Sequence, residues 1–198
     1  MKRLLALLLT LSLLAAARAE SETYTIDPVH SSAGFSIRHM FSKFSSSFTK
    51  TTGTITVDRA NLEQSSVEAT IEVASLSTFN ADRDKHLQSP AFFDAAKFSA
   101  ITFKSSAWKK TGENTFDVTG ALTIKDVTKN VVLKVTLLGF GPGMHPGSFL
   151  SGWEATTVLN RMDYGVSYGP KVLGDDVTVN IAIEAGFKKE QPAPAKQG

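Results

Sequence analysis

The chain has 198 residues and nearly balanced charges, with 21 Lys and Arg against 19 Asp and Glu, which excludes the large basic excess expected of a nucleic-acid-binding protein. Apolar residues make up 42% and charged residues 20%, proportions typical of a folded globular protein. The absence of cysteine excludes a disulfide scaffold, a thiolate zinc site and a cysteine nucleophile.

The first segment, residues 1–19, has the pattern of a secretory signal peptide. Lys2 and Arg3 form a basic start, an apolar run extends over residues 4–17, and Ala17-Arg18-Ala19 is a small-residue cleavage site. The apolar run is short for a membrane span, so we expect cleavage, export and no membrane span in the mature protein. Because the leader carries three basic residues and no acid, the basic pI of the whole chain indicates no functional basic patch.

Alternating apolar and polar residues predict strands along most of the remaining chain. Turn signals such as Thr111–Asn114 and Lys125–Thr128 separate several of these strands. One apolar face on each strand, in antiparallel meanders, indicates an all-β barrel or sandwich. The clearest of the eight or nine runs are 67–73, 116–125, 131–137, 153–159 and 177–187, and the weaker ones are 23–29, 33–40, 53–58 and 100–107.

A short helical insert is predicted around residues 80–97, where the strand pattern breaks. Asn80 can cap a helix with Asp82 and Asp84 in its first turn, and Ser89-Pro90 is a second start signal. We therefore expect two short helices that pack over one end of the barrel.

The C-terminal residues 188–198 alternate Pro and Ala among charges and have no apolar partner. This composition predicts a disordered tail. Residues 20–187 contain neither a repeat nor a linker, and we expect them to form one domain.

A G-x-S-x-G motif lies at residues 165–169. As a hydrolase nucleophile elbow, this motif needs a buried strand before it and a helix after it. Here Pro170-Lys171 and then Gly174-Asp175-Asp176 follow, so we interpret the motif as part of a glycine-rich loop between strands.

The four histidines are His30, His39, His86 and His145, and none is paired at the spacing of metal ligands. We therefore expect no metal site, no cofactor and no catalytic residue. An enzyme that uses His39, His86 and Asp84 remains the alternative.

Two polar residues fall on strand faces that are otherwise apolar. His39 shares its face with Phe35 and Ile37, and Arg161 continues the inward set of its own strand. A buried charge must be paired or lie near water. Both residues therefore have two interpretations. They are structural, with Arg161 paired to an acid such as Asp163, or they contact the polar head of a ligand.

Thirteen phenylalanines stand against two tryptophans and three tyrosines, which suggests a large apolar interior. An eight-stranded barrel either fills its interior with side chains or holds a small ligand. Composition does not decide between these, so a filled barrel that serves as an interaction module also remains open.

Several motifs, in the same order along nearly the whole mature chain, resemble those of the YceI-like family. They are IDPVHS at 26–31, FSIRHM at 35–40, LST at 76–78, Arg83, His86-Leu87, Ser89, FFD at 92–94, ITFKS at 101–105, VTGALTI at 118–124, VTK at 127–129, ATT at 155–157 and Asn160-Arg161.

The resemblance implies a periplasmic, lipocalin-like protein that is not an enzyme. It implies an extended antiparallel eight-stranded β-barrel whose apolar tunnel holds a polyisoprenoid or another lipid-like chain, and it implies a possible homodimer. The polar candidates for ligand contact are His39, His86, Arg161 and Asp84. The apolar candidates for the tunnel wall are Phe35, Ile37, Phe41, Phe44, Leu87, Phe92, Phe93 and Leu122.

Overall fold

The structure is a computed structural model that describes residues 21–188. The expected signal peptide at 1–19 lies outside the described residues. So does the expected tail, apart from Lys188, which ends the last strand.

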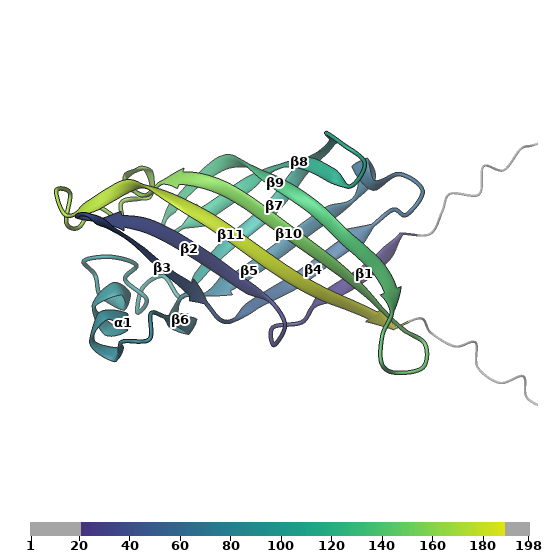
Figure 1. Ribbon diagram of the computed structural model, residues 1–198, viewed down its shortest axis with the longest axis horizontal. Helices are drawn as coiled ribbons and strands as arrows, with labels where there is room; N and C mark the ends of the chain where they lie inside the picture. Colours follow the sequence, from purple (N-terminus) through teal and green to yellow (C-terminus); the bar gives the residue numbers. More distant parts are fainter. Residues whose placement is uncertain (1–20, 189–198) are drawn as a thin grey trace, which may run out of the picture.

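Eight strands close into an antiparallel barrel (Figure 1). Pairing of the last strand with the first completes the ring, with Thr25 opposite Gly186 and Ile26 opposite Ala185. The eight-stranded antiparallel barrel that the resemblance implies is therefore confirmed, and of the barrel and the sandwich that the alternation left open, the protein forms the barrel. Around the ring the strands are β1 (Glu22–Ile26), β4 (Thr51–Val57), β5 (Ser66–Glu72), β7 (Ala100–Lys110), β8 (Thr115–Ile124), β9 (Val127–Pro142), β10 (Ser148–Asn160) and β11 (Leu173–Lys188).

A second group of strands extends the wall at one end of the barrel. β2 (Ser32–His39) pairs with the first half of β11, β3 (Ser42–Phe48) pairs with β2, and β6 (Leu76–Ser77) pairs with β3. The β2–β3 hairpin points to the end opposite the start of β1 and the end of β11 (Figure 1).

β3 and β6 were not expected from the sequence. β3 reads SKFSSSF, which has little apolar alternation to reveal a strand. It forms because β2 offers a complete ladder, from Ala33 opposite Phe48 to His39 opposite Ser42. β6 has two residues, too few to show any period.

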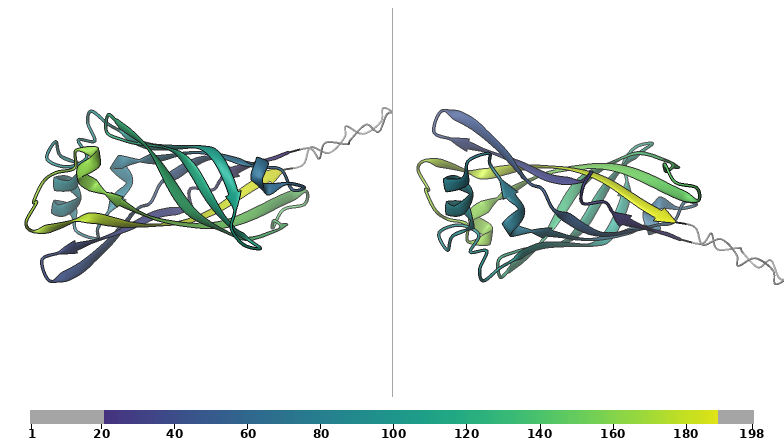
Figure 2. Two further views of the ribbon diagram at one scale, coloured as in Figure 1. Left: turned by 90° about the horizontal axis from the view of Figure 1, so that it is seen from above. Right: turned by 90° about the horizontal axis from the view of Figure 1, so that it is seen from below.

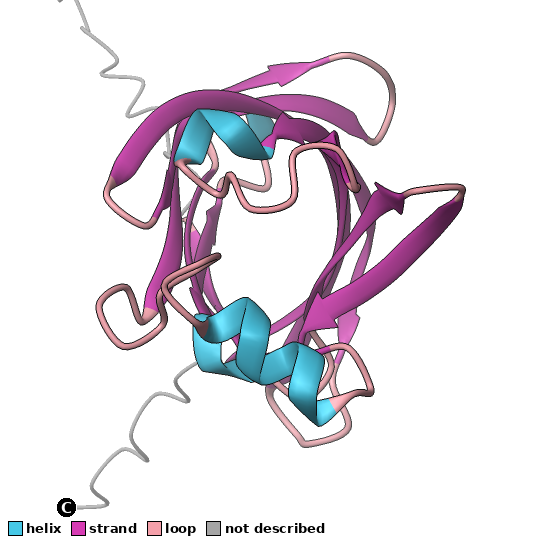
Figure 3. Ribbon diagram, turned by 90° about the vertical axis from the view of Figure 1, so that its left-hand side faces the viewer, coloured by secondary structure: helices cyan, strands magenta, loops and turns pink. Residues whose placement is uncertain are grey.

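The insert contains one α-helix, α1 (Ala81–Gln88), which begins at the expected cap. Asn80 Oδ1 accepts a hydrogen bond from the Arg83 N–H at 2.9 Å. The prediction of a second helix after Ser89 is wrong. Asp94 adopts a positive φ of 51°, which interrupts a right-handed helix, and residues 90–98 form turns instead. α1 lies at the rim of the barrel opening (Figure 3).

Three single-turn 3₁₀ helices complete the described elements: η1 (Leu62–Gln64), η2 (Val73–Ser75) and η3 (Arg161–Tyr164). Within residues 21–188, no helix is long and apolar enough to cross a membrane.

The interior holds two apolar clusters, one toward each end of the barrel. The first gathers around Tyr24, Trp108 and Trp153 and involves β1 and β4. The second gathers around Phe48 and Tyr164 and packs against residues of the insert. The alternation along β8 supplies both clusters, because every second side chain of a strand faces inward.

The strand register predicts a stability contrast between two positions. Leu122 is buried, whereas Asn180 is exposed on β11. Leu122→Ala should lower the free energy of unfolding by about 2–5 kcal/mol, and Asn180→Ala should change it by no more than about 0.5 kcal/mol. Urea unfolding of both variants measures the contrast. Equal, small effects at both positions would contradict the assigned faces.

Candidate functional site

A cavity of about 740 Å³ runs inside the barrel between its strands. This volume is within the roughly 300–1,000 Å³ of ligand pockets. Inward side chains of both the ring strands and the β2–β3 hairpin line it, and most of them are aliphatic or aromatic. The interior is therefore hollow along part of its length, which composition left open. We call this cavity the tunnel.

Aromatic side chains close the barrel beyond the end of the tunnel where β1 lies. Tyr24 packs edge-on against Phe187 with 5.1 Å between ring centroids, and the Arg59 guanidinium lies 4.2 Å from the centre of the Phe140 ring. The Tyr24 hydroxyl donates to Glu22 Oε2 at 2.6 Å, and burial raises the pKa of this phenol to about 12. The hydroxyl therefore stays neutral.

Trp108 and Trp153 line the tunnel toward this closed end. Their rings meet edge to face with centroids 5.6 Å apart. Neither indole N–H has a hydrogen-bond partner in the described part of the chain. They are the two tryptophans of the sequence, so the intrinsic fluorescence of the protein reports on the tunnel.

The other end of the tunnel, which we call the mouth, carries most of its polar side chains. The β2–β3 hairpin, α1 and the loop before β11 meet there (Figure 1). The mouth is lined by His39, Ser42, Phe44, Arg83, His86 and Tyr168.

Arg83 is a residue of the mouth that the sequence did not single out as a polar candidate. Its Nε donates to Thr78 Oγ1 at 2.9 Å and its NH2 to the Thr78 carbonyl at 2.7 Å. The guanidinium carbon lies 4.4 Å from the centre of the Phe44 ring. This geometry depends on β3, the serine-rich strand without a period, so no sequence signal reveals it.

His86 joins α1 to the loop before β11 through aromatic contacts. Its ring centroid lies 5.1 Å from that of Phe92 and 5.0 Å from that of Tyr168, and Phe92 and Tyr168 are 4.9 Å apart. These three rings narrow the mouth on one side. His86 therefore borders the tunnel, and its contact with a ligand stays a prediction.

Arg161 is buried, and its guanidinium donates hydrogen bonds to backbone carbonyls. NH1 donates to the carbonyls of Val166 at 2.5 Å and Tyr168 at 2.9 Å, and Nε donates to the Gly174 carbonyl at 2.8 Å. NH2 lies 3.4 Å from Asp175 Oδ1. Arg161 thus holds the loop before β11 in place, which favours its structural interpretation over contact with a ligand head.

Asp163, the acid suggested as an ion-pair partner of Arg161, pairs with another residue. Asp163 Oδ2 lies 3.2 Å from Lys129 Nζ. The loop held by Arg161 contains the G-x-S-x-G motif at 165–169, and a strand, not a helix, follows it. The motif is therefore a loop, as interpreted from the sequence.

Most of the candidate residues border the tunnel, Arg161 among them, and their contact with a ligand stays a prediction. His39 and His86 line the mouth, and every apolar candidate except Phe41 lines the tunnel: Phe35, Ile37, Phe44, Leu87, Phe92, Phe93 and Leu122.

Phe41 and Asp84 require correction, because neither lines the tunnel. Phe41 is fully exposed at the tip of the β2–β3 hairpin, since the alternation of β2 ends at His39 and the chain turns there. Asp84 Oδ1 accepts the Thr78 N–H at 2.8 Å, so this carboxylate stabilises the start of α1.

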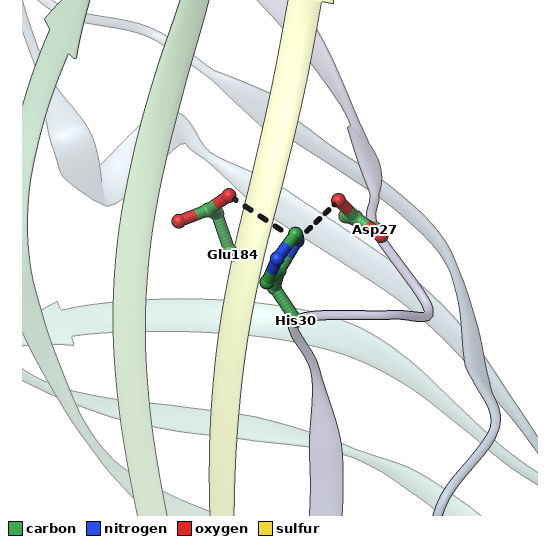
Figure 4. A group of neighbouring side chains, drawn as sticks. All are labelled: Asp27, His30 and Glu184. Carbon is green, nitrogen blue, oxygen red and sulfur yellow. Dashed lines mark hydrogen bonds and ion pairs between the residues drawn. The ribbon is translucent and has the colours of Figure 1, made fainter. Parts of the chain in front are cut away.

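A polar corner lies outside the tunnel, where β1 gives way to β2 along β11 (Figure 4). Asp27 Oδ2 lies 2.8 Å from His30 Nδ1, and Glu184 Oε1 lies 3.8 Å from the same nitrogen. Asp27 Oδ1 also accepts the Val29 N–H at 2.8 Å. Among residues 21–188 this is the one group of three possible metal ligands within 4.8 Å. It does not include His39, His86 or Asp84.

The charges of the polar corner should contribute most to the free energy of unfolding at mildly acidic pH. The hydrogen bond between the Asp27 carboxylate and the His30 ring lowers the pKa of Asp27 from 3.8 and raises the pKa of His30 from 6.5. The Asp27 contribution is present above pH 3.8 and is lost as pH falls through its lowered pKa. The His30 contribution is complete below pH 6.5 and is lost as pH rises through its raised pKa.

The urea midpoints of the wild type and His30→Ala should therefore differ most between pH 3.8 and 6.5. The difference should shrink at alkaline pH. A difference independent of pH would show that the corner contributes nothing through charge.

Comparisons with known proteins agree with the fold. The YceI-like domain family matches residues 24–185. A UPF0312 protein of Pseudomonas savastanoi pv. phaseolicola is 38% identical over 191 residues, which cover 95% of this chain and 98% of that protein. A UPF0312 protein of Azotobacter vinelandii is 34% identical over 186 residues, with 92% and 96% covered.

Solved structures show the same barrel. The YceI protein of Campylobacter jejuni superposes with a TM-score of 0.69 at 32% identity, covering 76% of this chain and 88% of that one. BcnA of Burkholderia cenocepacia has a TM-score of 0.71 at 24% identity, covering 81% and 99%. A polyisoprenoid binding domain from Saccharophagus degradans has a TM-score of 0.63 at 15% identity, covering 82% and 97%.

Proposed function

The chain belongs to the YceI-like family, and from this membership and the tunnel we propose that it binds a long-chain isoprenoid or similar lipid and carries or sequesters it without catalysis. The observation that carries the proposal is the cavity of about 740 Å³, whose lining is apolar except near the mouth. The similarity to a protein described as a polyisoprenoid binding domain supports this class of ligand.

Binding in such a tunnel relies on apolar burial, which contributes about 25 cal/mol for each Å² removed from water. A few polar groups then orient one end of the ligand. His39 and His86 line the mouth with Arg83, and these three side chains are the polar groups we assign to that role. Arg161 is not among them, because it is buried and all three of its guanidinium nitrogens contact the backbone or Asp175, whereas Arg83 uses only Nε and NH2 for hydrogen bonds within the described residues.

Export forms part of the proposal. The cleavage site at Ala17-Arg18-Ala19 predicts a mature chain that begins at Glu20, and we place this chain in the periplasm. A carrier in that compartment would move or store lipid between membranes without needing a covalent step.

Mass spectrometry of an organic extract of the purified exported protein tests the proposal. We expect a long apolar lipid in a stoichiometric amount. An empty extract, together with unchanged tryptophan fluorescence when an isoprenoid alcohol is added, would instead support the filled-barrel interaction module. Chemical conversion of the added isoprenoid, abolished in His39→Ala, would support the enzyme.

A further inference from the structure

The tip of the β2–β3 hairpin exposes two large apolar side chains to solvent. Phe41 is 100% exposed and Met40 is 50% exposed. They form the two-residue turn between His39 and Ser42, which pair with each other. Such turns favour Gly and Asn, and Met40 has a positive φ of 47°. Turn formation alone therefore does not explain why Met and Phe occupy this tip.

The tip borders the mouth of the tunnel. His39, Ser42 and Phe44 of the same hairpin line the mouth, whereas Phe41 points elsewhere. The Met40 N–H donates to the Val172 carbonyl at 2.8 Å, which ties the tip to the loop before β11. The hairpin flares away from the barrel at the end where α1 lies (Figure 2).

Cationic side chains stand directly behind the tip. Arg38 and Lys43 face each other across the hairpin, and Lys171 is exposed in the loop that the tip contacts. One acid, Asp176, lies beside Arg38 and Lys43. An apolar tip backed by cations matches the interface of a bilayer, where the apolar groups enter the acyl boundary and the cations meet phosphates.

The size of the tip favours a bilayer over a second copy of the chain. A large aromatic side chain buries about 150–250 Å², and Met40 is already half covered. A stable protein interface needs about 800 Å² from each partner. Two side chains fall well short of that area, whereas insertion into lipid has no such requirement.

We propose that the Met40–Phe41 tip inserts into the surface of a phospholipid bilayer, so that the mouth of the tunnel opens toward the membrane. This inference rests on the proposed lipid binding, because it supplies the route by which the lipid enters and leaves. The tip acts as a reversible anchor and takes no part in holding the lipid within the tunnel.

Co-sedimentation with vesicles of phosphatidylcholine and phosphatidylglycerol tests the anchor in the full mature protein. The wild type should bind the vesicles, and Phe41→Ser should weaken binding by about tenfold to a hundredfold, the loss expected for one buried aromatic side chain. Met144→Ser is the matched control. Met144 is 97% exposed and lies in the loop between β9 and β10, at the opposite end of the barrel (Figure 1), so this variant should bind like the wild type.

The outcomes separate this inference from the proposed function. Affinity for a soluble isoprenoid without vesicles should be unchanged in Phe41→Ser, because Phe41 does not line the tunnel. Vesicle binding that is absent, or equal in Phe41→Ser and wild type, overturns the anchor. Self-association lost in Phe41→Ser, without vesicle binding, overturns it in favour of a second copy. Vesicle binding by a protein whose tunnel takes no lipid keeps the anchor and rejects the proposed function.

Discussion

Arg161→Ala is expected to lower the free energy of unfolding by about 3–5 kcal/mol, the usual cost of removing one partner from a buried charged network. The variant leaves the buried carbonyl of Val166 without its donor, and the carbonyls of Tyr168 and Gly174 lose theirs. At about 2–4 °C for each kcal/mol in a domain of this size, the melting temperature should fall by roughly 6–20 °C.

Lys109→Ala is the control for this prediction, because Lys109 is exposed on β7 and its loss should cost no more than about 0.5 kcal/mol. Affinity measurements with anionic and uncharged lipid heads add a second readout. Our structural assignment of Arg161 predicts that both ligands weaken alike as the loop loosens. A selective loss of about tenfold or more for the anionic head, with stability unchanged, would return Arg161 to the binding site.

Ala155→Phe is expected to abolish most lipid binding while the barrel still folds. Ala155 lines the tunnel two residues beyond Trp153 on β10, so a phenyl ring there blocks the deeper part. If the ligand loses contact for about four methylene groups, at about 0.8 kcal/mol each, affinity falls by more than about a hundredfold. Titration of lipid into the variant, followed by tryptophan fluorescence, measures the loss.

Ala182→Phe is the matched control for the blocked tunnel. Ala182 lies on the neighbouring strand β11, opposite Glu154, and is exposed. The same enlargement there leaves the tunnel unchanged and should leave binding near the wild-type value. Full lipid binding by Ala155→Phe, with its melting temperature preserved, would show that the ligand lies elsewhere.

The alternation of the sequence determined the antiparallel strands and most of their inward faces, and it left a barrel and a sandwich open. The runs that became β8, β10 and β11 each hold a period of two over many residues, and one buried face on every strand requires a closed or layered sheet. The helix cap at Asn80 could also be predicted from the sequence, because the start of a helix depends on a few adjacent residues. These are local features, so neighbouring residues along the chain are enough to express them.

The tertiary structure alone decided the features that depend on distant partners. β3 is a strand because β2 pairs with it. Phe41 lies outside the tunnel because the hairpin turns immediately after His39. Arg161 is structural because two carbonyls from the loop before β11 and the Gly174 carbonyl at the start of β11 converge on it. Whether the barrel is hollow depends on which side chains meet across its interior. The sequence gives the volume of each side chain. The distance between opposite walls of the barrel is set only when β1 pairs with β11 and closes it.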